Sequence, residues 1–85
     1  MTSWQYVGTC IDGQRFEIAG VDVWTQQWVP RQGESATVQD PLYGQSFTFP
    51  VYDMATGKER VVFAAGEFSN CVWGFYLPVS SEDSM

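Results

Sequence analysis

The residues that most often carry enzyme chemistry are scarce in this 85-residue chain. It contains no His, and its only cysteines, Cys10 and Cys71, are far apart in the sequence. His is the commonest general base, and a structural zinc site needs four Cys or His ligands. The sequence therefore predicts no catalytic triad, no metal site and no cofactor, and favours a non-catalytic function.

One segment in the second half of the chain resembles ligand-binding loops without completing them. Residues 56–58 (Thr-Gly-Lys) match the end of a phosphate-binding loop, but Tyr52 stands where that loop requires Gly. Asp53 and Glu59 suggest a calcium loop, but the alternating Asp or Asn ligands are absent. Acidic pairs that could cleave glycosidic bonds are not fixed by spacing alone. We interpret residues 53–58 as the loop of a hairpin.

Aromatic side chains are the strongest functional signal in the sequence, with four Trp, four Tyr and six Phe. Most should build the core, and seven are expected there: Tyr6, Phe16, Phe47, Phe49, Phe63, Trp73 and Phe75. So small a domain cannot bury all of them, and exposed Trp and Tyr mark binding surfaces. The surplus is expected in residues 24–28 and in the turn at 40–44. The sequence thus predicts a binding surface of Trp24, Gln26, Trp28 and Tyr43.

The charge balance narrows the range of partners. The net charge is −6, from ten acidic residues and four Lys and Arg. Nucleic acids and anionic membranes require clustered cations, so neither is expected as a direct ligand. Residues 1–8 do not resemble a signal peptide, and the longest apolar run, 61–65, is too short to cross a bilayer. These features favour a cytoplasmic location and two reduced thiols rather than a disulfide.

The elements that must position these side chains are predicted to be strands. Turn signals recur about every ten residues, and good helix formers are few. The predicted fold is all-β: a small antiparallel barrel or two-layer roll of five to seven short strands, with at most one short helix within residues 21–28. Residues 1–79 are expected to form one domain, and residues 80–85 a flexible acidic tail.

Individual strands are predicted from side-chain alternation. Residues 4–10 should pair with residues 14–19 across a three-residue loop, with Gly13 left-handed and Tyr6 facing Ile18. Residues 21–29 fit either a strand or a helix, and Pro30 should end that element. Pro50 places its strand at a sheet edge or at a bulge. Residues 71–77 are apolar on both faces, so this last strand should be central, with Cys71 and Trp73 buried.

Three functions remain open. The leading hypothesis is a protein-interaction module, accessory or inhibitor-like, with exposed aromatic residues inside an acidic rim. The same aromatic residues could instead close a homodimer. The second hypothesis is a domain that binds a sugar or another small ligand, because Trp and Tyr faces stack on apolar surfaces. The third is an acidic decoy of a nucleic-acid-binding protein.

Overall fold

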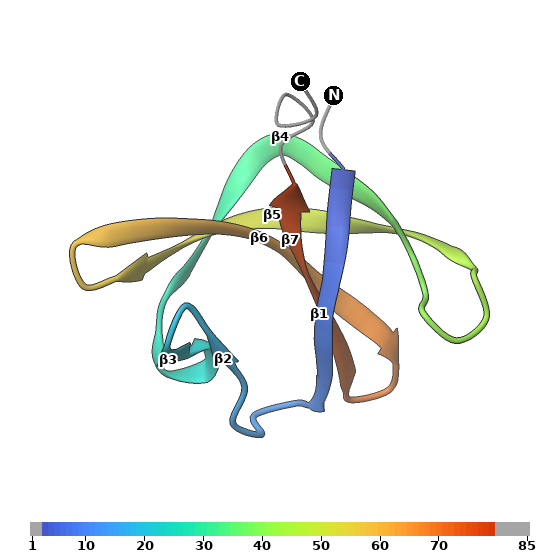
Figure 1. Cartoon of the computed structure of the whole chain (residues 1–85), viewed down its shortest axis with the longest axis horizontal. Coiled ribbons are helices and arrows are strands. Elements are labelled where there is room, and N and C mark those ends of the chain that lie inside the picture. The colour runs from blue at the N-terminus through green and yellow to red at the C-terminus, as the bar shows by residue number, and fades with distance from the viewer. Residues whose placement is uncertain (1–2, 80–85) are drawn as a thin grey trace.

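The chain folds into a strongly bent antiparallel sheet with a small hairpin on one face (Figure 1). The computed structural model describes residues 3–79. Five strands form the main sheet in the order β1-β7-β6-β5-β4, and β2 pairs with β3. The elements are β1 (Ser3–Ile11), β2 (Glu17–Ile18), β3 (Val21–Asp22), the 3-10 helix η1 (Val23–Thr25), β4 (Trp28–Gln39), β5 (Ser46–Thr56), β6 (Glu59–Ser69) and β7 (Val72–Val79).

The predicted all-β class is confirmed, with a compact but incompletely closed sheet. The outer strands β1 and β4 approach each other but share no ladder. We call the gap between them the seam. Because the sheet bends back on itself, the strand pairs at its two ends face each other across an apolar layer, as in a two-layer roll.

Alternation along the strands divides the apolar side chains between the two faces of the sheet. In β6, Phe63 and Ala65 point to one face and Ala64 points to the other, as the pleat requires. The hairpin-side core lies under β2, β3 and η1, and its buried members are Cys10, Ile18, Val23, Met54, Phe63, Ala65 and Phe75. The seam-side core lies on the other face, and its buried members are Ala36, Val38, Phe49, Val51, Ala64 and Tyr76.

The first strand has a different partner from the one predicted. β1 pairs with β7 along its whole length, and residues 14–19 contribute only the two-residue β2, which pairs with β3. The predicted pairing of residues 4–10 with 14–19 is therefore wrong. β7 offers β1 a longer ladder and a strand that is apolar on both faces. Gly13 does adopt the predicted left-handed conformation, with φ of 83°, and the Gln14 N–H donates to the Ile11 carbonyl at 2.8 Å.

Two predicted breaks in the chain are also wrong. Pro30 continues β4 instead of ending it, because β4 is an edge strand and no neighbour requires the missing N–H. Residues 53–56 belong to β5, so only Gly57 and Lys58 separate it from β6. Met54 explains this extension, since its side chain is fully buried in the hairpin-side core.

Of the remaining local predictions, those for Pro50 and for the last strand are confirmed, and the one for Cys71 is wrong. Pro50 lies where predicted, at a local edge, because the β5–β6 ladder begins only at Val51. The last strand is interior, between β1 and β6, and Phe75 and Tyr76 are buried on its two faces. Cys71 is not buried: it occupies the turn before β7, exposed and with φ of 66°. The predicted acidic tail, residues 80–85, lies outside the described residues.

Candidate interaction groove

Trp24 and Trp28 pack together against the hairpin-side core. The two ring centroids are 5.2 Å apart, and each ring also meets Trp73 and Phe75 edge-on. The Trp28 indole N–H donates to the Val23 carbonyl at 2.7 Å, which ties the start of β4 to η1. Both side chains are half-buried. Their contacts are those of core aromatics at the rim of the cluster.

Trp73 lies beside this aromatic pair, and Gln26 lies between Trp24 and Trp28 in the sequence. Trp73 is half-buried, whereas Phe63 and Phe75, which were expected beside it, are fully buried in the same core. Gln26 ends η1: its N–H donates to the Val23 carbonyl at 3.3 Å, and its side chain donates to the Thr25 hydroxyl. Gln26 therefore has a local role in closing the helical turn.

Tyr43 lies elsewhere, in the loop between β4 and β5. In Figure 1 this loop is at the right, and β2, β3 and η1 are at the lower left. The loop is held by hydrogen bonds to Asp40: the Gly44 N–H donates to the Asp40 carbonyl at 2.9 Å, and the Tyr43 N–H donates to the Asp40 carboxylate at 2.6 Å. The structure thus brings Trp24, Gln26 and Trp28 together and leaves Tyr43 apart from them.

The β4–β5 loop forms one lip of an apolar groove, which we call the mouth groove. Leu42 and Tyr43 are 81% and 82% exposed, the highest values among the large apolar side chains of residues 3–79. The groove has a volume of about 590 Å³. Besides this loop it is lined by residues of β1, β5, β6 and β7: Tyr6, Thr9, Phe47, Phe68, Ser69 and Val72.

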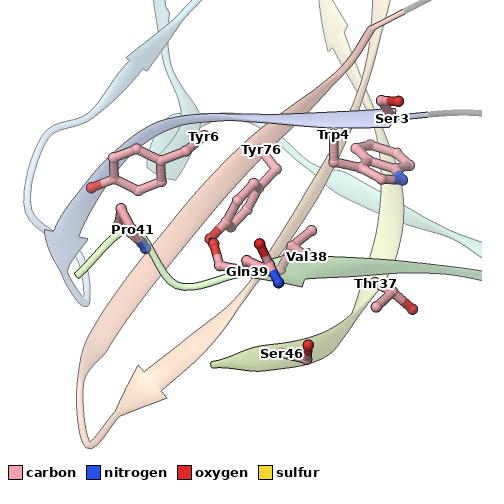
Figure 2. Close-up of a pocket in the computed structure, with 9 residues that line it drawn as sticks. All are labelled: Ser3, Trp4, Tyr6, Thr37, Val38, Gln39, Pro41, Ser46 and Tyr76. Atoms are coloured by element: carbon pink, nitrogen blue, oxygen red, sulfur yellow. The ribbon is translucent and has the colours of Figure 1, made fainter. Parts of the chain in front are cut away.

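A second hollow, the seam groove, continues from the first along the gap between β1 and β4. Its volume is about 510 Å³, and Tyr6 and Pro41 line both grooves. Figure 2 shows Trp4 and Tyr6 on β1, Thr37 to Gln39 on β4, and the Tyr76 ring between them. The other lining residues are mainly small and polar: Ser3 and Ser46.

Tyr76 forms the floor of the seam and fastens its two sides. The phenol of this β7 residue donates to the Gln39 carbonyl at the end of β4, over 2.7 Å. Burial, with a smaller effect from the nearby Asp40 and Tyr6, raises the pKa of Tyr76 to about 12. A phenol with this pKa stays protonated at neutral pH. The seam therefore offers hydrogen bonding but no general base at Tyr76.

Charge is distributed unevenly between this end of the molecule and the rest. Asp40 is the only charged residue lining either groove within residues 3–79. Arg15 pairs with Glu17 in the small hairpin, and Arg31 pairs with Glu34 and Asp53, both at 3.2 Å. Lys58 and Arg60 lie at the β5–β6 hairpin, at the left of Figure 1. The groove end therefore presents apolar surface and negative charge.

The sequence signal for the mouth groove was incomplete. It identified Tyr43 but assigned Tyr6 and Phe47 to the core, and Tyr6 is 38% exposed at the groove. Leu42 carried a usable signal, since an apolar residue in a turn after Pro41 has little to pack against. Phe68 and Val72 reach the groove only because β6 ends and β7 begins there, which no local pattern reveals.

Comparison with protein-family models, with curated proteins and with solved structures finds no match to this chain. Within residues 3–79, no group of three or more His, Cys, Asp or Glu side chains is placed to hold a metal ion. Over the same range, no helix has the length and apolar character of a membrane span.

Proposed function

We propose that this chain is a non-catalytic protein-interaction module, accessory or inhibitor-like, that binds its partner through the mouth groove. The observation that carries the proposal is the pair Leu42 and Tyr43, almost fully exposed at the lip of a concave apolar surface. Exposed apolar side chains beside a groove are typical of interaction sites, and Tyr is enriched among the residues that dominate binding energy. The partner is expected to be apolar at its centre and basic at its rim.

The state of the cysteines is in keeping with an intracellular partner. Cys10 is buried and Cys71 is exposed, and both are free. Free exposed thiols are typical of reducing compartments, so we place this interaction in the cytoplasm.

Peptide selection followed by titration tests the proposal. Peptides are selected from a displayed library on the immobilised protein, and the best binder is titrated by calorimetry. We expect Leu42→Ser together with Tyr43→Ser to weaken binding at least tenfold, since truncating a hot-spot Tyr costs ~2 kcal/mol or more. The melting temperature should not change, because neither side chain is buried.

Val29→Ser provides the matched control. Val29 is 46% exposed, also apolar, and lines neither groove. This variant should bind the peptide as the wild-type protein does. If the Leu42 and Tyr43 double variant keeps full affinity, or if Val29→Ser weakens binding equally, the mouth groove is not the binding site.

A second candidate function, sugar binding, is supported by the seam groove. Its lining combines the Trp4 indole with the side chains of Ser3, Thr37, Gln39 and Ser46. Carbohydrate sites combine such an apolar face with several hydrogen-bonding groups. A glycan array distinguishes the two functions: glycan binding abolished by Trp4→Ala and unaffected by Tyr43→Ser would favour this second candidate.

A further inference from the structure

The two edges of the main sheet differ in how they are protected against pairing with another chain. β4 carries Pro30, Gly33 with φ of 82°, a register shift between Pro30 and Ser35, and the charges of Arg31 and Glu34. Proline, bulges and charges are the usual devices that block an exposed edge. β1 contains no charged residue and no proline, and its one irregularity is the bulge between Tyr6 and Gly8.

The register of β1 against β7 shows which backbone groups point away from the sheet. Trp4 lies opposite Pro78, which has no N–H to donate, so this is a position without ladder bonds. Bonded and unbonded positions alternate in an antiparallel ladder, so Trp4 and Tyr6 direct their N–H and C=O groups to the open edge. Beyond the bulge, the Asp12 N–H donates to the Cys71 carbonyl at 2.7 Å, which makes Thr9 and Ile11 the outward positions.

Some of these outward groups already have partners. The Ile11 N–H donates to the Gln14 side-chain oxygen at 3.4 Å, and the Ile11 carbonyl accepts from the Gln14 N–H. No turn, cap or side-chain hydrogen bond within residues 3–79 occupies the backbone groups of Tyr6 or Thr9. The side chains of these same two residues line the mouth groove. The open part of the edge thus runs directly beside the groove.

We infer that the β1 edge from Tyr6 to Thr9 binds an extended segment of a partner protein as an additional strand, whose apolar side chains enter the mouth groove. The inference rests on the proposed function and specifies the partner's conformation. Strand addition supplies affinity through backbone hydrogen bonds and specificity through pockets for alternate side chains. The β1 edge provides the backbone hydrogen bonds, and the groove beside Tyr6, Leu42 and Tyr43 provides the pocket for side chains.

The charge of the partner segment follows from its surroundings. Asp40 is the one charged residue that lines the groove among residues 3–79, the four cations of the chain lie elsewhere, and the net charge is −6. A segment that alternates apolar with basic residues complements this surface. A second copy of the chain would bring another six net negative charges and is the less favourable occupant.

A peptide with alternating character separates strand addition from simple apolar binding. The probe is an eight-residue peptide of alternating Lys and Val, titrated against the full chain by calorimetry. Two further peptides carry N-methyl groups on alternate amides, one set on each edge of the extended peptide. An added strand bonds through one edge only, so one methylated peptide should bind like the parent and the other at least tenfold more weakly.

A Glu-for-Lys peptide tests the charge, and amide hydrogen exchange tests the location. The Glu peptide should bind at least tenfold more weakly than the Lys peptide. The bound parent peptide should slow exchange at the Tyr6 and Thr9 amides and leave the Arg31 amide on the β4 edge unchanged.

The outcomes distinguish this inference from the proposed function. Equal binding of both methylated peptides, unchanged exchange at Tyr6 and Thr9, or no binding of the parent at millimolar concentration would overturn strand addition. If the Leu42 and Tyr43 variants still lost affinity for their selected peptide, the proposed function would survive. Sedimentation showing a dimer with protected β1 amides would make a second copy the occupant and would also overturn the inference.

Discussion

At the scale of single residues, three aromatic rings lie directly on glycines of neighbouring strands. Ideal Cβ atoms added at Gly8, Gly66 and Gly74 would lie 2.5, 2.3 and 2.3 Å from the rings of Phe16, Phe49 and Phe68. No side chain fits at such distances. These glycines therefore allow large rings to pack flat on the sheet, which is how so small a domain accommodates its many aromatic residues.

Gly66→Ala tests this packing. Gly66 is buried in β6, and the added methyl group would overlap the Phe49 ring near its attachment, where the ring cannot easily move aside. We expect a loss of about 1–3 kcal/mol in the free energy of unfolding, the usual cost of overpacking. Urea denaturation measures it.

A second substitution provides the control for this prediction. Phe49→Leu removes the ring that the methyl group meets, so adding Gly66→Ala to that background should cost less than it does in the wild-type protein. Equal costs in the two backgrounds would show that the Phe49 ring is not what excludes a side chain at position 66.

At the scale of elements, η1 and the start of β4 act as a lid over the hairpin-side core. Asp22 begins η1 by accepting the Trp24 N–H at 3.1 Å, and Trp28 closes it through the Val23 carbonyl. The aromatic pair Trp24 and Trp28 then covers Phe63 and Phe75. In contrast, the β4–β5 loop holds Leu42 and Tyr43 away from any core.

Trp28→Ala and Tyr43→Ala should therefore separate stability from binding. We expect Trp28→Ala to lower the free energy of unfolding by about 3 kcal/mol, because it removes a packed ring and the shorter of the two hydrogen bonds to the Val23 carbonyl, leaving only the Gln26 N–H. Tyr43→Ala should leave the melting temperature unchanged and weaken peptide binding. Thermal melts and titrations on both variants measure this; a Trp28→Ala protein that melts like the wild type would show that the Trp28 ring does not stabilise the core.

At the scale of the whole molecule, the bent sheet remains open along the seam between β1 and β4. One direct link across it is the hydrogen bond from Tyr76 on β7 to the Gln39 carbonyl at the end of β4. That bond requires the protonated phenol, because a phenolate has no proton to donate. The hydrogen bond that links the two sides of the seam is therefore lost at alkaline pH.

The pH dependence of stability follows from Tyr76. Its pKa is raised by burial from 10.0 to about 12 in the folded protein. Between these pH values the folded chain keeps the proton that the unfolded chain has lost. The contribution of Tyr76 to the free energy of unfolding is therefore fully present below pH 10 and is lost as the pH rises from 10 towards 12. Urea denaturation across this range should show the loss, with a shallower slope in Tyr76→Phe. An identical slope in the variant would assign the loss to other groups.

Short stretches of the sequence determined the fold class and several local features of the backbone. Glycines, prolines and alternating apolar residues correctly predicted the all-β class, the left-handed Gly13, the turn at 40–44, the local edge at Pro50 and an interior last strand. Each of these depends on a few adjacent residues, because backbone conformation and strand alternation are short-range properties. The exposure of Tyr43 belongs to the same class, since a turn has no neighbour to bury it.

Only the tertiary structure decided which strands pair and which faces meet. β1 pairs with β7, at the far end of the chain, and this pairing makes β7 an interior strand, with Phe75 and Tyr76 buried on its two faces. The bulge after Tyr6 then changes which side chains of β1 point to the seam, so Tyr6 and Thr9 share one face three positions apart. Cys71 lies in a turn because the ladder between β6 and β7 sets where that turn falls. The mouth groove is likewise built from three separate stretches of the chain, residues 6–9, 40–47 and 68–72, and their meeting depends on long-range packing that no short stretch of sequence encodes.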